Sequence, residues 1–328
     1  MRACKILSFS VVILLIAVLF VGVVTIPAAA QYDTMQFRYN AQHTSDYSPV
    51  AGSNTSNGNL TWSFTTGHYV FSCPAVVNGV VYVGSDDNNV YALNTTTGAK
   101  LWNYTTGGYV GSSPAVVNGV VYVGSYDKNI YALYAATGAK LWNYATRGSV
   151  TSSPAVVNGV VYVGSYDSNI YALNAATGAK LWNYATGDSV LSSPAVANGT
   201  VYVGSNDNNT YALNAATGAK LWNYTTGSYV DSSPAVANGT VYVGSDDNNI
   251  YALNAATGAK VWNYTTGSAV FSSPAVSNMV VYVGSNDGNV YAIGSAAMAT
   301  SQSTTPGFEV VLAFVGFVIA AYVVRRRR

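Results

Sequence analysis

Residues 110–144 read VGSSPAVVNGVVYVGSYDKNIYALYAATGAKLWNY, and this stretch decides the fold. The apolar run Val110–Val117 is followed by Asn118-Gly119, a pair that favours a two-residue hairpin turn because both positions accept a positive φ. A second apolar strand follows, then a polar loop and a third strand. A glycine-containing turn leads to a fourth strand at Lys140–Tyr144. Four short strands without a helix-period segment predict one antiparallel sheet.

This unit recurs with a period of 40 residues. Its clearest marker is the tryptophan of the fourth strand, which stands at Trp62, Trp102, Trp142, Trp182, Trp222 and Trp262. A period near 40 residues with four strands per unit is typical of β-propeller blades. We therefore expect an all-β, six-bladed propeller over residues 60–294, in which the tryptophans pack each blade onto the next.

The strand count also predicts how the ring closes. The tryptophan strand occurs six times, but its first copy, Leu60–Phe64, precedes the first full unit, and no tryptophan follows Ile293. We expect this N-terminal strand to complete the last blade, because closure would hide sheet edges that invite aggregation.

The N-terminus carries an export signal. Residues 1–30 begin with Arg2 and Lys5, continue as an apolar run and end in small residues, which predicts a signal peptide cleaved near Ala30–Gln31. The apolar run exceeds the usual ~7–15 residues, so an uncleaved anchor is the alternative. Residues 31–59 then form a lead-in segment before the propeller.

The C-terminus has the features of a sorting signal or a membrane anchor. A Ser/Thr-rich linker, residues 295–305, precedes the segment 306–328, which contains Pro306-Gly307-Phe308, an apolar run Val310–Val324 and four arginines. Fifteen apolar residues fall short of the ~20 of a comfortable span, while the arginines mark the cytoplasmic side. The segment resembles the archaeal PGF-CTERM sorting signal, which implies removal of the tail and attachment of a lipid. The alternative is a retained transmembrane anchor, and both place the propeller at the cell surface.

Composition narrows the possible partners. Charged residues make up 8% of the chain, against roughly 25% in ordinary soluble proteins. Between the two terminal signals, eight basic residues face twelve aspartates, so no basic patch for nucleic acid is expected. Sequons for N-glycosylation are frequent, and sugar would supply the missing solubility: Asn54, Asn59, Asn94, Asn103, Asn198, Asn208, Asn223, Asn238 and Asn263.

The linker Ala172–Trp182, which recurs with small changes, looks like the tryptophan-docking motif of PQQ-type quinoprotein propellers. The segment Phe37–Thr44 also resembles the lead-in of PQQ-like proteins, including the assembly factor BamB. The resemblance implies a propeller acting either as an envelope assembly scaffold or as a PQQ-dependent oxidoreductase. The enzymes of this family hold PQQ against an adjacent-cysteine disulfide, whereas this chain has only Cys4 and Cys73. We therefore expect no enzyme and no cofactor.

Metal and acid–base chemistry receive little support from the sequence. The two histidines, His43 and His68, are too few for a typical histidine metal site or a triad. The repeated Asp-x-Asn loops, such as Asp87 to Asn89, could supply oxygen ligands to Ca²⁺. We favour turn chemistry, in which Asp bonds its own backbone and Asn takes the left-handed region, and we expect no metal.

Variation between the repeats gathers in two loops that a propeller places on one face, around the channel mouth. The residues there form our candidate binding face: Tyr69, Phe71, Tyr109, Tyr126, Arg147, Tyr166, Asp188, Tyr229, Asp231 and Phe271. Aromatic residues and Arg are frequent hot spots of interfaces. The alternative is drift at loosely constrained positions. We expect a non-enzymatic surface module that binds a surface protein or a glycan, with an assembly scaffold as the second hypothesis.

Overall fold

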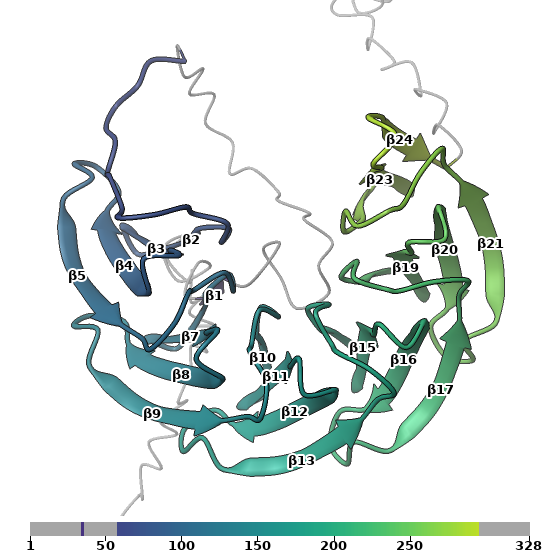
Figure 1. Ribbon diagram of the computed structural model, residues 1–328, viewed down its shortest axis with the longest axis horizontal. Coiled ribbons are helices and arrows are strands. Elements are labelled where there is room, and N and C mark those ends of the chain that lie inside the picture. The colour runs from purple at the N-terminus through teal and green to yellow at the C-terminus, as the bar shows by residue number, and fades with distance from the viewer. Residues whose placement is uncertain (1–33, 36–57, 295–328) are drawn as a thin grey trace, which may run out of the picture.

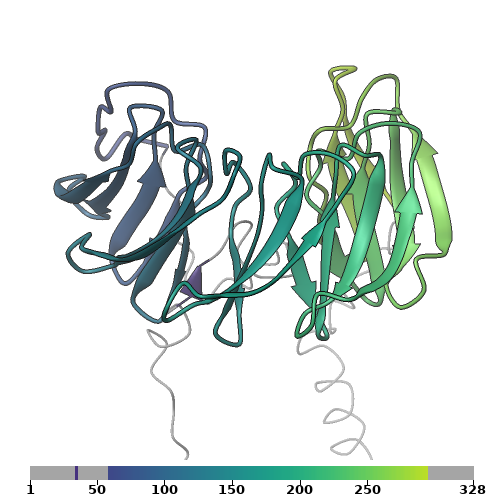
Figure 2. The same ribbon diagram turned by 60° about the horizontal axis from the view of Figure 1, so that its bottom comes forward.

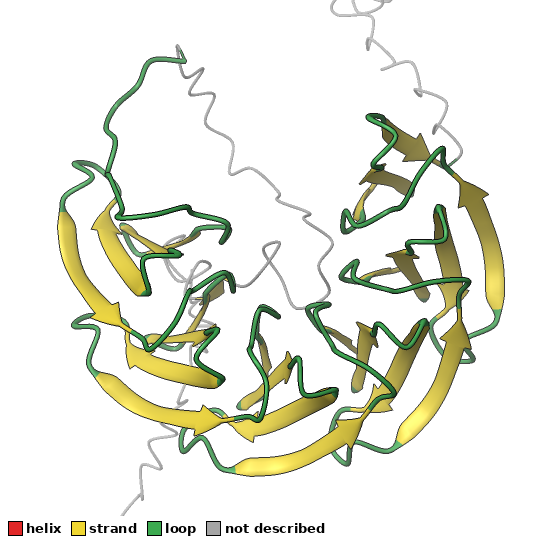
Figure 3. Cartoon of the chain, viewed as in Figure 1, coloured by secondary structure: helices red, strands yellow, loops and turns green. Residues whose placement is uncertain are grey.

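The computed structural model describes residues 34–35 and 58–294, and this part of the chain is entirely β-structure and loops (Figure 3). The predicted signal peptide, most of the lead-in segment, the Ser/Thr linker and the C-terminal segment lie outside the described residues. The strands form six antiparallel sheets that follow one another along the chain (Figure 1), as the 40-residue period predicted.

Each sheet is one blade, numbered here in chain order. Blade 1 contains β2 (Ala75–Val77), β3 (Val80–Gly84), β4 (Asn89–Asn94) and β5 (Lys100–Thr105). Blade 2 contains β6 (Ala115–Val117), β7 (Val120–Gly124), β8 (Asn129–Tyr134) and β9 (Lys140–Ala145), and β1 (Thr34–Met35) pairs with the inner edge of β6. Blade 3 contains β10 (Ala155–Val157), β11 (Val160–Gly164), β12 (Asn169–Asn174) and β13 (Lys180–Ala185).

The remaining blades keep this order, except that the last lacks an outer strand. Blade 4 contains β14 (Ala195–Ala197), β15 (Thr200–Gly204), β16 (Asn209–Asn214) and β17 (Lys220–Thr225). Blade 5 contains β18 (Ala235–Ala237), β19 (Thr240–Gly244), β20 (Asn249–Asn254) and β21 (Lys260–Thr265). Blade 6 contains β22 (Ala275–Ser277), β23 (Val280–Gly284) and β24 (Val290–Ile293).

The innermost strand is shorter than the sequence suggested. The apolar run from Val110 forms a strand only over β6, because Pro114 before it has no N–H to donate to a ladder. The residues that precede β6 bind the neighbouring blade instead. The backbone N–H of Ser113 donates to Oγ of Ser153 at 2.9 Å, and the same bond recurs from Cys73 to Ser273.

The turns within a blade confirm most of the predicted chemistry. Asn118 and Gly119 both have positive φ, 52° and 74°, as the two-residue hairpin requires. In the Asp-x-Asn loop, the left-handed residue is the middle one, for example Lys128, and not the Asn as predicted. Asn129 already belongs to β8, and its backbone N–H and side-chain amide both donate to Oδ1 of Asp127. The aspartate therefore closes the turn as expected, while the residue with positive φ stands one position before the Asn.

The core lies between adjacent blades. The second and third strands are buried on both faces, so each sheet packs against neighbours on two sides. One cluster joins Val90 and Trp102 of blade 1 to Val121 and Leu133 of blade 2, and equivalent clusters occupy the other junctions. Each blade thus completes its core only in contact with the next.

The tryptophans dock each blade onto the next, as predicted. The indole Nε1 of Trp102 donates to the carbonyl of Ala135 in blade 2 at 2.8 Å, and the hydroxyl of Tyr82 donates to the same carbonyl at 3.2 Å. A Cβ on Gly138 would lie 2.6 Å from the ring of Trp102, so the indole covers this glycine at closest approach. The Trp bond recurs from Trp62, Trp142, Trp182 and Trp222, and Trp262 is half-buried.

The predicted closure by residues 60–64 is not formed in the structure. The six sheets form an arc with blades 1 and 6 at its ends (Figures 1 and 2), and among the described residues β24 pairs only with β23. Trp62 nevertheless donates to the carbonyl of Thr95, and Phe64 packs edge-on against Tyr91 at 5.3 Å. Residues 60–64 form no strand, and they dock onto blade 1 through Trp62 and Phe64 without pairing to β24.

Replacing one docking indole should unfold the arc. Trp142 is 9% exposed, and Trp142→Ala removes its packing and leaves the carbonyl of Ala175 with one donor fewer. A loss of about 3–5 kcal/mol in unfolding free energy is expected for a buried Trp→Ala change. Urea denaturation measures this loss. The neighbouring Leu141 is 52% exposed, and Leu141→Ala is the control, with little change expected. Equal losses in the two variants would contradict the docking role.

Candidate aromatic binding face

The two variable loops of a blade lie against each other, as predicted. In blade 2, the backbone N–H of Tyr126 donates to the carbonyl of Tyr109 at 2.9 Å, and blade 1 has the same bond from Asp86 to Tyr69. Because this backbone bond recurs in blades 1 to 6, the side chains of both loops emerge on one face of the arc. The loops that carry the predicted site residues therefore share a face, and the direction of each side chain decides which residues meet.

Six aromatic rings on this face form one continuous chain across blades 1, 2 and 3, which we call the aromatic ribbon. In order, its members are Phe71, Tyr69, His68, Tyr109, Tyr126 and Tyr166. Successive ring centroids lie 4.6–6.4 Å apart, within the range of favourable aromatic pairs. The ribbon is also exposed, with Tyr69 at 67% and Phe71 at 72%. The rings of the ribbon are therefore both exposed and in contact with one another.

The phenol groups of the ribbon interact with one another. Partial burial is the main cause of a raised pKa of Tyr126, and the neighbouring phenol of Tyr166 and the carboxyl of Asp86 raise it further. Tyr126 therefore remains a neutral donor and acceptor at neutral pH, beside a ring face that can take apolar surface.

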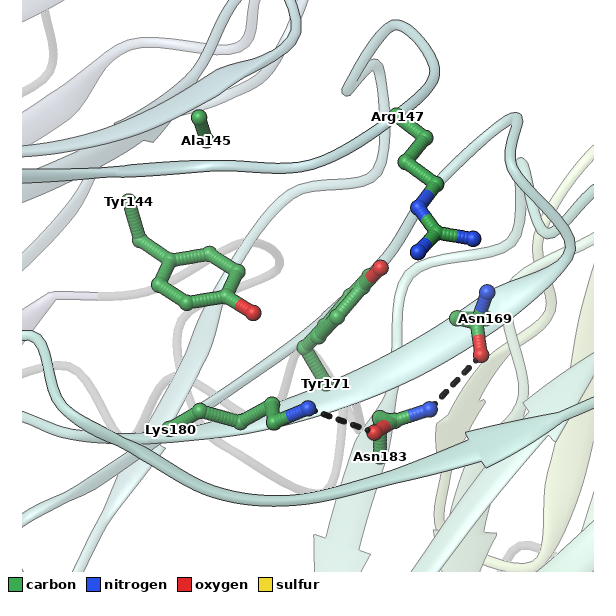
Figure 4. Close-up of a pocket in the computed structure, with 7 residues that line it drawn as sticks. All are labelled: Tyr144, Ala145, Arg147, Asn169, Tyr171, Lys180 and Asn183. Atoms are coloured by element: carbon green, nitrogen blue, oxygen red, sulfur yellow. Dashed lines mark hydrogen bonds between the residues drawn. The ribbon is translucent and has the colours of Figure 1, made fainter.

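Five of the predicted site residues do not join the ribbon, and one of them, Asp231, belongs to the acidic group described below. Tyr229 and Phe271 are exposed on blades 5 and 6 and have no aromatic partner among the described residues. Asp188 is exposed in blade 4. Arg147 does not lie beside the tyrosines as expected. Arg147 lies just after β9, and its side chain lines a pocket together with Tyr144 and Lys180 (Figure 4).

A second group, absent from the predicted site apart from Asp231, lies on blades 4 and 5. Asp231, Asp246 and Asn206 each have a buried oxygen without a hydrogen-bond partner. Burial raises the pKa of Asp231, with partial relief from the Asn206 amide. Burial, followed by repulsion from Asp231 and Asp247, raises the pKa of Asp246 to about 6. The face therefore has an aromatic side and an acidic side.

Sequence reasoning missed His68, Asp246 and Asn206. From the sequence we consider His68 only as a metal ligand or a triad member, and we reject both roles. Its position beside Tyr69 in a variable loop was enough to predict that its ring joins the ribbon. Asp246 and Asn206 stand at variable loop positions, and nothing in the sequence shows that they become buried there. Among residues 58–294, no three His, Cys, Asp or Glu side chains gather closely enough to hold a metal ion. The carboxylate of Asp127 is instead occupied by bonds from Gly107, Asn129 and Tyr131.

The six repeated sheets define a β-propeller whose variable loops lie on one face. Residues 117–305 match the family model described as the β-propeller of the beta-alanine-activating enzyme. This match spans more than half of the chain, which therefore belongs to this propeller family. Residues 41–109 match a model described as outer membrane protein assembly factor BamB. No curated protein matches the chain.

Solved structures share the fold at low identity. The computationally designed Ika8 protein is 20% identical with a TM-score of 0.63, covering 68% of this chain and 70% of its own. BamB from Moraxella catarrhalis is 22% identical with a TM-score of 0.50, covering 71% and 88%. Quinohemoprotein alcohol dehydrogenase from Comamonas testosteroni is 22% identical with a TM-score of 0.62, covering 82% of this chain and 53% of its own. The chain therefore spans about half the length of that enzyme.

The C-terminal signal is also matched. Residues 305–327 fit the PGF-CTERM motif model, which indicates an exported archaeal protein anchored at the membrane. This segment lies outside the described residues. Within the part of the chain that the structure describes, no helix is long and apolar enough to cross a membrane.

The pKa of Asp246 predicts a pH dependence of stability. The pKa of this carboxyl rises from 3.8 to about 6 on folding, so the folded chain binds the proton more tightly than the unfolded chain does. The resulting contribution to stability is fully present below pH 3.8 and is lost as the pH rises through 6. Asp246→Asn should therefore have no such loss, so its melting temperature relative to wild type should rise between pH 4 and pH 7. Thermal unfolding at both pH values measures this difference. Asp231→Asn should lower the carbon-13 titration midpoint of Asp246, and an unchanged midpoint would contradict the coupling.

Proposed function

We propose that this protein is a non-enzymatic, membrane-anchored surface propeller that binds a surface protein or a glycan through the aromatic ribbon. The observation that carries the proposal is the unbroken chain of six exposed rings across three blades. The only aromatic residues that blades 4 to 6 carry at the predicted face positions are Tyr229 and Phe271. Random drift at the loop positions would spread aromatic residues over all blades. Their concentration on one side of a repetitive molecule supports a binding role instead.

The ribbon suits a partner with an extended surface. Tyrosine rings offer large, rigid contact area at low cost in conformational entropy, and their hydroxyls add hydrogen bonds. Ring-to-ring packing holds Tyr109 between His68 and Tyr126, which reduces the freedom that each side chain would lose on binding. The phenols and ring faces fit either the C–H faces and hydroxyls of a sugar chain or a protein surface.

The sequence supports a role without catalysis. The chain lacks the adjacent cysteines that hold PQQ in the enzymes that it resembles, and its one glutamate, Glu309, lies in the C-terminal segment. Cys73 is a free, exposed thiol. An envelope assembly scaffold is the second candidate, favoured by the match of residues 41–109 to the BamB model. Capture of an envelope assembly component, rather than a glycan, would support that role.

The anchoring step yields a first prediction. We propose that the tail from Val310 is removed and replaced by a lipid, and that the mature chain begins near Gln31. Intact-mass analysis of protein extracted from the native cell surface measures both ends. The expected mass lacks the residues from Val310 to Arg328 and includes a lipid. A mass that retains the four terminal arginines would identify a transmembrane anchor instead.

The ribbon yields a second prediction, with a matched control inside the chain. Tyr109 and Tyr229 occupy the same repeat position and are equally exposed, at 49% and 48%, but only Tyr109 belongs to the ribbon. Tyr109→Ser should weaken partner binding by about 2 kcal/mol or more, as for an interface hot spot. Tyr229→Ser should leave the affinity unchanged.

Glycan arrays and pull-downs from the surface proteome, with the detergent-purified full chain, supply the partner for this comparison. Both variants should melt within about 1 °C of wild type, because these side chains are on exposed loops. If both variants capture the partner as well as wild type does, the ribbon has no binding role. Equal loss would point to the whole face rather than to the ribbon.

A further inference from the structure

One position in the repeat departs from its five copies in a way that adds chemistry. Residues 67, 107, 187, 227 and 267 are glycine, whereas residue 147 is arginine, the only arginine of the described residues. The backbone bond of this position is kept, since the N–H of Arg147 donates to Oδ2 of Asp167 at 2.8 Å. At the five glycines, an added Cβ would approach the equivalent aspartate to 3.0–3.1 Å, so a side chain here is crowded. Blade 3 accepts this crowding.

The arginine side chain enters a pocket on the outer side of the junction between blades 2 and 3. The pocket has a volume of about 270 Å³ and is lined by Tyr144, Ala145, Arg147, Asn169, Tyr171, Lys180 and Asn183. Figure 4 shows the guanidinium group of Arg147 and the ammonium group of Lys180 on two sides of the pocket, with the hydroxyls of Tyr144 and Tyr171 between them. Two cationic groups and two phenols thus face one space.

The acceptors around the pocket are already used by neighbouring groups. Lys180 Nζ donates to Asn183 Oδ1 at 3.0 Å, and Asn183 Nδ2 donates to Asn169 Oδ1 at 2.8 Å (Figure 4). Both oxygens of Asp167 are occupied, Oδ1 by bonds from Asn169 and Oδ2 by the Arg147 N–H and the Tyr171 hydroxyl. No described residue accepts a hydrogen bond from the guanidinium group of Arg147. Its five N–H donors remain available.

An oxyanion is the ligand that this arrangement fits. A guanidinium group binds carboxylate, sulfate or phosphate oxygens through two parallel hydrogen bonds, and a nearby ammonium adds a second positive charge. The tyrosine rings can cover the apolar part of a small molecule that carries such a group. The small volume excludes a large ligand. We propose that this pocket binds the oxyanion group of a small polar molecule, separately from the aromatic ribbon.

The repeats provide both a loss and a gain variant for the test. Arg147→Gly restores the residue of the five other copies, so it should fold as well as wild type. Six of the seven lining residues recur at the next junction as Tyr184, Ala185, Asn209, Tyr211, Lys220 and Asn223. The double change Gly187→Arg with Asp188→Gly converts the loop 187–190 to the Arg-Gly-Ser-Val sequence of residues 147–150. It should create a second pocket.

Isothermal titration of the detergent-purified full chain with sulfate, phosphate and glucuronate, in low-chloride buffer, measures binding. Wild type should bind at least one of the three at one site per chain, and the best probe identifies sulfate, phosphate or carboxylate as the group recognised. Arg147→Gly should weaken that binding at least tenfold, and the double variant should bind two per chain. No binding of any probe to wild type, or equal binding by Arg147→Gly, would overturn the proposal. Failure here leaves the ribbon's role untouched, because no ribbon residue is changed.

Discussion

At each of the four junctions among blades 1 to 5, one backbone carbonyl receives two hydrogen bonds from the preceding blade, and the arrangement of these sheets depends on it. At the first junction, the carbonyl of Ala135 accepts from Trp102 and from Tyr82. The two donors come from different strands of the same sheet, so both must be in register for the bonds to form. A buried carbonyl without partners is costly, and these donors satisfy it while fixing the spacing of the sheets.

The same interaction explains why the chain can present an ordered but open arc. Trp62 has the contacts of a docking indole although the segment that carries it, residues 60–64, forms no strand and pairs with no sheet. At the other end, Tyr282 is exposed, whereas the equivalent Tyr122 of blade 2 is buried. Docking acts forward along the chain, while strand pairing acts within a sheet. The two can therefore be satisfied independently at the ends of a repeat array.

Local chemistry was readable from the sequence, and side-chain direction was not. The 40-residue spacing of Trp62 to Trp262, the Asn118-Gly119 turn and the shared face of the variable loops depend on short-range rules. The closure by residues 60–64 depends on the curvature of the whole array, which no single repeat encodes. Arg147 was expected beside the tyrosines because its loop lies there. Its side chain leaves the end of β9 in another direction.

For the ribbon, the necessary information was present but spread over several repeats. Tyr109 has an aromatic neighbour in its own blade, Tyr126, while Tyr229 has Asp246 at that position. Reading the two variable loops together, blade by blade, separates an aromatic side from an acidic side. The raised pKa of Asp246 required the structure, because it arises from burial and from the approach of Asp231 across the loops.

The near-identity of the junctions has a consequence for how such a protein can change its length. The docking tryptophans from Trp62 to Trp222 each meet a glycine and a carbonyl in the same places, so the junctions among blades 1 to 5 are interchangeable with one another. Unequal recombination between two copies, in multiples of 40 codons, would add or remove a whole blade without creating an unfamiliar contact. The curvature of the array and the number of loops on its face would change in one step. A gene of this kind can therefore vary the loop-bearing face of its protein by copy number as well as by point mutation.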